Sequence, residues 1–141
     1  IYYRSPWAIA VSGLVALSTN ILWLGHGPWT FFQFIGWSVV GIGGSIFADK
    51  LHVDGRIALN RLIPFSVLSA FAFDWIVSVS ILLNHDLSAF YPYLINGLLF
   101  DVFHALGNAV FVVLLANPLG ELMSRNRTVN RGVAVSEVVT S

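Results

Sequence analysis

The sequence predicts an all-α integral membrane protein, a helix bundle with four membrane-spanning helices in this chain. Of its 141 residues, 57% are hydrophobic and 10% are charged, whereas soluble domains carry about 25% charged residues. Four apolar segments reach the roughly 20 residues that are needed to cross a bilayer. The cations are confined to alternate connections between these segments. An unusually apolar soluble protein is the alternative, and it does not explain four such segments with this charge pattern.

Prolines and polar connections set the expected helix bounds. Pro28 and Pro92 suit first-turn positions, whereas Pro118 suits a helix stop. Pro64 is tolerated near the start of the third helix. No strand pattern is visible. We expect a transmembrane bundle over residues 1–118 and a polar cytoplasmic tail over 119–141. The expected helices cover about residues 6–24, 29–48, 62–83 and 91–117.

The positions of the basic residues predict the orientation. All seven Lys and Arg residues lie before the first segment, between the second and third, or after the fourth. They are Arg4, Lys50, Arg56, Arg61, Arg125, Arg127 and Arg131. By the positive-inside rule, both chain ends are cytoplasmic, and the connections Gly25–Pro28 and Asn84–Phe90 lie outside. The absence of cysteine excludes disulfides and Cys-ligated metals, and the net charge of zero gives no indication of nucleic-acid binding.

Each apolar segment carries a row of small or polar residues at i, i+4 spacing. Such rows let membrane helices approach closely, so most of these positions are interpreted as packing contacts. The rows are Ala8, Ser12, Ala16, Asn20; Gln33, Trp37, Gly41, Ser45; Ser66, Ala70, Asp74, Ser78; and Gly97, Asp101, Ala105, Ala109. Gly41, Gly43 and Gly44 predict that the second helix makes the closest contacts.

The stretch Asn96–Asn108 carries the most informative polar residues. On a helix, Gly97, Asp101, His104 and Asn108 fall within an arc of about 60°. An ionisable pair in an apolar helix must face protein, water or ligand, because lipid does not tolerate it. Asn96 lies off this stripe.

With this orientation, the larger polar groups gather in the outer halves of the helices. At 1.5 Å per residue, Asp74 and Asp101 lie at similar depths, about 14 Å below the outer ends of their helices. We therefore predict a polar vestibule that opens outward and is walled by aromatic rings. The predicted substrate-binding residues are Asp101, His104, Asn108, Asp74, Gln33, Trp37, Asn20 and Trp29. We predict no catalytic residue, no metal ligand and no cofactor.

Structural roles remain open for the same residues. Asp101 and His104, three positions apart, could pair with each other. Asp74 could be neutral and hydrogen-bonded in the protein interior. Asn20 and Gln33 could be solvated residues at the interface, and Trp29 could belong to an interfacial aromatic belt.

Two stretches resemble a known family. LGHGPWTFFQFIGW (Leu24–Trp37) resembles a GxGPWTPWQ signature, and PYLINGLLFDVFHALGNAVFVVLLANP (Pro92–Pro118) resembles a signature of a last membrane helix. Both are similar to the substrate-specific subunits, or S components, of energy-coupling factor transporters. The resemblance covers most of residues 8–118. The chain departs from it at Phe31–Phe32, which stand in place of Pro-Trp.

The resemblance implies a six-helix bundle in a bacterial or archaeal plasma membrane, which binds a vitamin or related micronutrient from outside without being an enzyme. Its partners would be a transmembrane coupling subunit and two ATPase subunits. The four helices here would be the third to sixth, so two helices and upstream sequence are expected to be missing. Gly27, Pro28, Trp29, Gln33, Asp101, His104 and Asn108 occupy the motif positions.

Two other functions are compatible with the residues. The chain could be an accessory or cofactor-carrying small subunit of a larger bioenergetic membrane complex, in which His104 binds a haem or pigment. A bis-His haem would need a second histidine in the membrane, and the sequence has none. The chain could also be a proton- or cation-coupled carrier that uses Asp74, Asp101 and His104 as a relay. No motif of a phosphate-binding loop or of an enzyme nucleophile is present.

Overall fold

The structure is a computed structural model that describes residues 5–53 and 56–139, with side chains over 6–23, 25–53 and 56–123. Most of the described residues are helical, so the predicted all-α class is confirmed. The four helices are α1 (Ser5–Thr19), α2 (Pro28–Ile46), α3 (Leu59–Ser78) and α4 (Leu87–Val139). A π-helical segment, η1 (Asn20–Leu24), continues α1, and a 3₁₀ segment, η2 (Val79–Leu83), continues α3.

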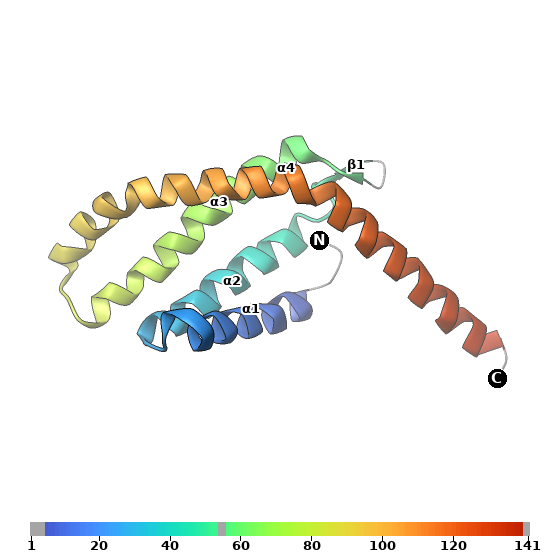
Figure 1. The fold of residues 1–141 in the computed structure, drawn as a ribbon, viewed down its shortest axis with the longest axis horizontal. Helices are drawn as coiled ribbons and strands as arrows, with labels where there is room; N and C mark the ends of the chain where they lie inside the picture. Colours follow the sequence, from blue (N-terminus) through green and yellow to red (C-terminus); the bar gives the residue numbers. More distant parts are fainter. Residues whose placement is uncertain (1–4, 54–55, 140–141) are drawn as a thin grey trace.

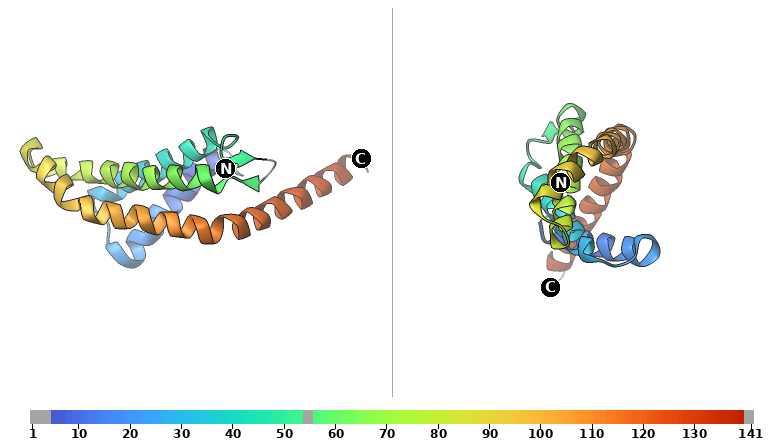
Figure 2. Two further views of the ribbon diagram at one scale, coloured as in Figure 1. Left: turned by 90° about the horizontal axis from the view of Figure 1, so that it is seen from above. Right: turned by 90° about the vertical axis from the view of Figure 1, so that its left-hand side faces the viewer.

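The chain runs back and forth along one direction (Figure 1). The connections after η1 and after η2 lie at one end of the molecule, and the connection between α2 and α3 lies at the other. Each helix packs against the next one in sequence, and the most extensive packing is between α3 and α4 (Figure 2). Over the described residues, no contact of similar extent joins α1 to α4. The helices therefore form an open array.

Three helical segments are long and apolar enough to cross a membrane among the described residues. They are Pro6–Trp23, Leu59–Leu83 and Leu87–Met123. The fourth predicted span, α2, has 19 residues, which is close to the length required. It is not among the segments that meet the criterion of length and apolarity. These lengths and compositions are compatible with a multi-pass membrane protein.

The structure differs from the sequence-based expectation at two places. A short antiparallel hairpin of β1 (His52–Val53) and β2 (Arg56–Ile57) joins α2 to α3, although no strand was expected. The sequence does contain a signal for it, because Asp-Gly is a preferred dipeptide in two-residue hairpin connections. This dipeptide, residues 54–55, lies outside the described part.

The second difference concerns the prolines of the last helix. Pro92 and Pro118 both lie inside α4, whereas Pro92 was expected in its first turn and Pro118 was expected to end it. Proline removes one helical hydrogen bond and usually kinks a helix. In Figure 1, α4 changes direction between its orange and red parts, so the helix bends where an end was predicted. The expected tail over 119–141 is helical as far as Val139.

The predicted rows of small and polar residues form the seams between helices. Ser12, Ala16 and Asn20 are buried on α1 and η1, and Asp74 and Asp101 are buried on α3 and α4. Ala70 and Ala105 are buried beside the two carboxylates. The largest apolar side chains mostly point outward, as shown by Leu22, Trp23 and Ile95, which are 72–89% exposed. This inverted pattern is typical of helices that face lipid.

Glycines in α2 permit the closest approaches. A methyl group added at Gly41 would lie 2.7 Å from Cβ of Ala8, and one added at Gly36 would lie 2.7 Å from the Phe73 ring. Real side chains essentially never approach so closely, so α1 would have to move away from α2 at Gly41, and the Phe73 ring would have to shift at Gly36. The expectation of intimate contact at α2 is confirmed for Gly41.

We predict that Gly41→Leu destabilises the fold by about 1–3 kcal/mol, the usual cost of overpacking a tight contact. Gly107→Leu on α4 is the matched control, because a Cβ at Gly107 has no neighbour within 4 Å. Chemical unfolding in detergent, followed by circular dichroism, measures both variants. Equal destabilisation by the two substitutions would contradict the close α1–α2 contact.

Candidate functional site

Six of the eight predicted site residues fall into two separate clusters. The first cluster consists of Asn20, Trp29 and Gln33 and joins the end of α1 to the start of α2. The second cluster consists of Asp74, Trp75, Asp101 and His104 and joins α3 to α4. In the described residues, no hydrogen bond connects the two clusters. The single vestibule that was predicted is therefore divided between two helix pairs.

Asn20 is the centre of the first cluster and is completely buried. Its side-chain amide donates to the Ala16 carbonyl at 2.6 Å and to Gln33 Oε1 at 2.6 Å. Its own oxygen accepts from Trp29 Nε1 at 3.3 Å. A buried polar group is costly unless it is hydrogen-bonded, and these three bonds satisfy the amide. The first cluster thus locks the π-helical end of α1 to α2.

The connection before α2 is shaped to hold Trp29 in this position. Pro28 begins the helix, as predicted, and Gly27 caps it while its N–H group donates to Thr30 Oγ1 at 3.3 Å. The Trp29 ring lies directly over Gly27, so that an added Cβ would overlap it. Glycine is therefore required for this contact. The Gly27-Pro28-Trp29 motif has a structural explanation that does not depend on a ligand.

The second cluster pairs residues across the α3–α4 seam. His104 Nδ1 lies 2.8 Å from Asp74 Oδ2 and 3.0 Å from Asp74 Oδ1. Trp75 Nε1 donates to Asp101 Oδ2 at 3.1 Å. Asp101 and His104 thus have their partners on α3, in place of the local Asp101–His104 pair that the sequence left open. Two polar links hold the same pair of helices together.

Aromatic rings surround His104. The Phe73 and Phe100 ring centres lie 6.1 and 6.0 Å from that of the imidazole. The Trp37 ring from α2 packs against Phe73 at 4.6 Å. Trp37 therefore reaches the second cluster only through Phe73. A few polar groups among flat apolar rings are the usual composition of a small-molecule site.

Two acceptor atoms of the second cluster have no partner within the described residues. They are His104 Nε2, on a side chain that is 26% exposed, and Asp101 Oδ1. When Nδ1 donates to Asp74, a neutral imidazole presents Nε2 as an acceptor. The cluster can therefore bind a group that donates hydrogen bonds, or share a proton with it.

The remaining predicted residue, Asn108, lies outside both clusters. It is half-buried on α4 and forms no side-chain hydrogen bond within the described part of the chain. Asn96 is exposed, in agreement with its position off the stripe. No group of three or more metal-binding side chains is found among the described residues. A cavity of about 690 Å³ lies elsewhere, and none of the predicted site residues lines it.

Two buried or hydrogen-bonded polar groups were not predicted, and one of them belongs to the second cluster. Trp75 was not among the predicted site residues, yet its indole N–H donates to Asp101 Oδ2. Its position directly after Asp74 on a helix was the available signal. Ser38 Oγ is buried on α2 and has no hydrogen-bond partner in the described structure. The spacing of residues in the sequence gave no indication that Ser38 would be buried without a partner.

A double-mutant cycle tests the pairing across α3 and α4. We predict that Asp74→Ala and His104→Ala are coupled by about 1 kcal/mol in unfolding free energy, as is typical of hydrogen bonds between membrane helices. The cycle of Asp101→Ala with His104→Ala is the control and should give a smaller coupling. The opposite order would indicate the local pair on α4 instead of the contact with α3.

Comparison with family models, with curated proteins and with solved structures finds no match for this chain. Its function is therefore argued from the residues and their geometry. The second cluster is the stronger candidate site, because it alone combines ionisable groups with unpartnered acceptors inside apolar helices.

Proposed function

We propose that this chain is the membrane-embedded, substrate-binding subunit of an ATP-driven micronutrient importer of the energy-coupling factor type. The observation that carries the proposal is the second cluster, which places two carboxylates, an imidazole and an indole N–H in the middle of two adjacent apolar helices. Ionisable groups at such positions are expensive to bury and are usually functional. Binding, without chemical conversion, is the proposed role.

The unpartnered acceptors favour binding over a purely structural role. One polar contact would be enough to join α3 to α4, whereas the structure has two, His104–Asp74 and Trp75–Asp101. Each contact leaves one acceptor atom without a partner within the described residues. Phe73 and Phe100 give the imidazole an apolar surrounding that strengthens hydrogen bonds to a bound ligand. The expected ligand is a small molecule with hydrogen-bond donors and a flat apolar part.

The two sequence motifs also support the proposal. The first motif supplies Trp29 and Gln33, the two partners of Asn20 in the first cluster, and the second motif supplies Asp101 and His104 together with the buried Ala105. Motif residues that determine how neighbouring helices pack are consistent with a shared architecture. In that architecture α1 to α4 would be the third to sixth helices, and α2 would cross the membrane with the others.

The transport mechanism would begin with capture of the ligand from outside by the second cluster. The connections after η1 and η2 lie at one end of the molecule and would close over the ligand. A transmembrane coupling subunit and two ATPase subunits would then supply the energy to reorient the bundle, because this chain has no nucleotide-binding motif. Sites near the membrane midplane are common in transporters.

A proton-coupled carrier is the second candidate, and the Asp74–His104 contact favours it. A carboxylate and an imidazole at 2.8 Å can exchange a proton, and Asp101 lies one turn away on α4. Chains of Asp and His side chains form proton relays in membrane pumps. Uptake into vesicles that is driven by a pH gradient, without any ATPase, would favour this candidate over the first.

We predict that Asp101→Asn and His104→Ala each weaken ligand binding at least about tenfold, the effect of losing one hydrogen bond to a charged group. The measurement is mass spectrometry of small molecules released from the detergent-purified chain. Asn96→Ala, an exposed position on the same helix, is the control and should retain the ligand. Undiminished retention in both site variants, with the helices intact by circular dichroism, would exclude the second cluster as the site.

The proposed orientation has a direct test, because the chain contains no cysteine. His26→Cys and His85→Cys, both at exposed positions, should react with a membrane-impermeant maleimide added outside intact cells. Val53→Cys, on the exposed hairpin, should react only after the membrane is permeabilised. Labelling of Val53→Cys in intact cells would reverse the orientation.

A further inference from the structure

The ionisable side chains of the second cluster do not balance one another in charge. The cluster has two carboxylates, on Asp74 and Asp101, and one imidazole, on His104. Two carboxylates and an imidazolium give a net charge of −1, and with a neutral imidazole the net charge is −2. In both states a negative charge remains within two apolar helices. A buried charge is costly unless it is paired.

Asp101 is the member of the cluster whose charge has no counterpart. His104 Nδ1 lies 2.8 Å from Asp74 Oδ2, so a protonated imidazole neutralises Asp74. Asp101 Oδ2 accepts only from a neutral donor, the indole N–H of Trp75. Its Oδ1 has no hydrogen-bond partner among the described residues, although the residue is only 5% exposed. The missing counter-charge therefore belongs at Oδ1.

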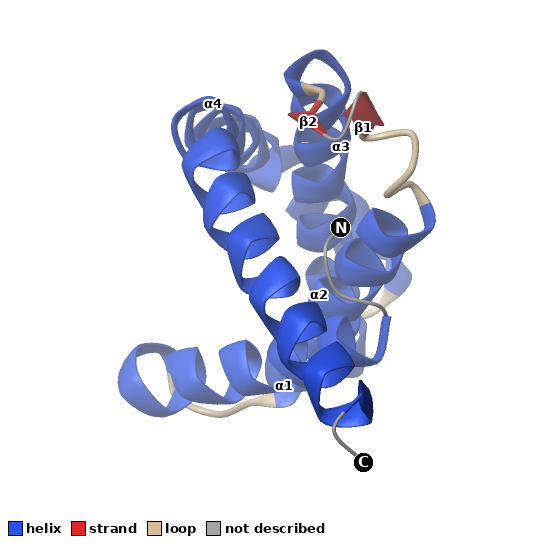
Figure 3. Cartoon of the chain, turned by 90° about the vertical axis from the view of Figure 1, so that its right-hand side faces the viewer, coloured by secondary structure: helices blue, strands red, loops and turns tan. Residues whose placement is uncertain are grey.

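The basic side chains that the structure describes lie far from this position. They are Lys50, Arg56 and Arg61, on the connection between α2 and α3 and in the first turn of α3. The start of α3 lies beside the β-hairpin (Figure 3). Arg61 Nη1 donates to the Lys50 carbonyl there, thirteen residues before Asp74, which is about 20 Å of helix. None of these cations compensates the second cluster.

The surroundings of the cluster suit an organic cation. The Phe73 and Phe100 ring centres lie 6.1 and 6.0 Å from that of His104, and the Phe71 ring lies 6.4 Å from that of Trp75. Aromatic faces attract ammonium groups and also pack against flat apolar groups. A metal cation such as Ca²⁺ takes six to eight oxygen ligands, and no group of three or more metal-binding side chains is found in the described part of the chain.

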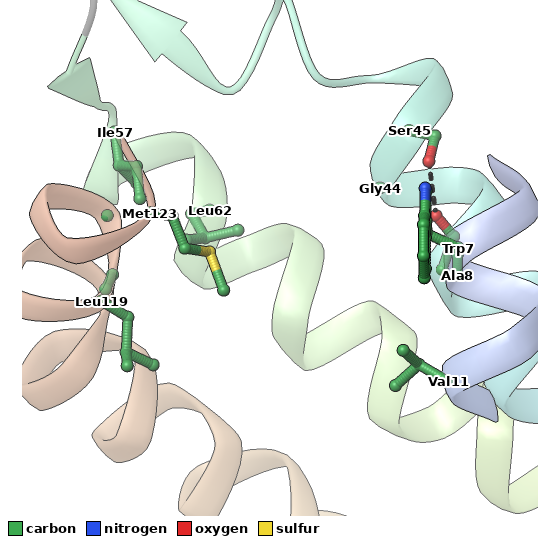
Figure 4. Close-up of a pocket in the computed structure, with 12 residues that line it drawn as sticks. Trp7, Ala8, Val11, Gly44, Ser45, Ile57, Leu62, Leu119 and Met123 are labelled. Carbon is green, nitrogen blue, oxygen red and sulfur yellow. Dashed lines mark hydrogen bonds between the residues drawn. The ribbon is translucent and has the colours of Figure 1, made fainter. Parts of the chain in front are cut away.

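The apolar cavity at the hairpin end offers no such site. Figure 4 shows Trp7, Val11 and Gly44 on one side of this cavity and Leu119 and Met123 on the other. None of its lining residues has an ionisable side chain. A cation bound there would lose its hydration without gaining a counter-charge. The second cluster is therefore the better place for a charged ligand.

We propose that the ligand of the second cluster is a small organic cation, a protonated primary amine attached to a flat ring. Its ammonium group donates to Asp101 Oδ1, and its ring lies against the aromatic side chains of the cluster. A primary ammonium has three N–H groups, so one also remains for His104 Nε2 when the imidazole is neutral. The inference deepens the proposed function and rests on it in taking the second cluster as the ligand site.

The test compares benzylamine with benzyl alcohol as probes of the full chain in an uncharged detergent. The two probes share a ring, and at pH 7 only the amine is charged. Ligand-observed NMR, with empty micelles as the blank, measures the dissociation constant of each. The wild type should bind the amine at least about tenfold more tightly, the effect of one hydrogen bond to a charged group. Asp101→Asn keeps the shape of the side chain and should abolish this preference.

Asp86→Asn is the matched control, because it removes the same charge from an exposed position outside the cluster. It should leave the preference for the amine unchanged. Trp75→Phe removes only the neutral donor to Asp101 and should keep most of the preference. Circular dichroism verifies that the variants fold. A wild type without preference for the amine overturns the inference whether or not Asp101→Asn folds, and so does equal loss of the preference in Asp101→Asn and Asp86→Asn.

The outcomes separate this inference from the proposed function. If the wild type binds both probes equally and Asp101→Asn weakens both, the second cluster remains the site and its preference for a cation is wrong. If the wild type binds neither probe at millimolar concentration, the inference is wrong, and retention of a ligand in mass spectrometry still tests the proposed function. If the amine is preferred but uptake needs no ATPase partner, the importer proposal alone is wrong.

Discussion

An ionisable side chain within an apolar helix must find a polar partner inside the protein, because hydrocarbon offers none. This requirement determines how α3 and α4 are joined. Asp74 and Asp101 are buried on facing helices, and each binds a nitrogen of the opposite helix, on His104 and on Trp75. The small residues Ala70 and Ala105 beside them let the two backbones come close enough for these bonds. Small side chains and polar links thus cooperate, and neither alone would specify this register of the two helices.

The same combination joins α1 to α2 by a different route. Here the contact is made by Gly41 against Ala8 at one end and by the Asn20 amide at the other. Neutral amides replace the ionisable groups, and all three hydrogen bonds of Asn20 are made within the protein. That difference separates a structural cluster from a candidate site. The Asn20 amide is satisfied within the protein, whereas the second cluster leaves His104 Nε2 and Asp101 Oδ1 available to a ligand or a proton.

Much of this architecture was predictable because helix periodicity is local. The expected first and third helices agree with α1–η1 and α3–η2 within a few residues, and the i, i+4 rows were found at the seams. What periodicity cannot give is the partner of each polar residue. Asp101 and His104 share one face of α4 and could have satisfied each other, but the approach of α3 decides the pairing. The local sequence also does not determine whether Pro118 ends the last helix or kinks it, since a proline can do either.

The two polar clusters and the apolar cavity together assign different tasks to the two ends of the array. Near the connection after η1 and in the middle of α3 and α4, polar side chains hold the helices in pairs. At the hairpin end the pairs diverge, and the cavity walls supply almost no hydrogen-bonding groups. A ligand bound at the second cluster would act on the α3–α4 seam, between helices that are already joined by two polar links.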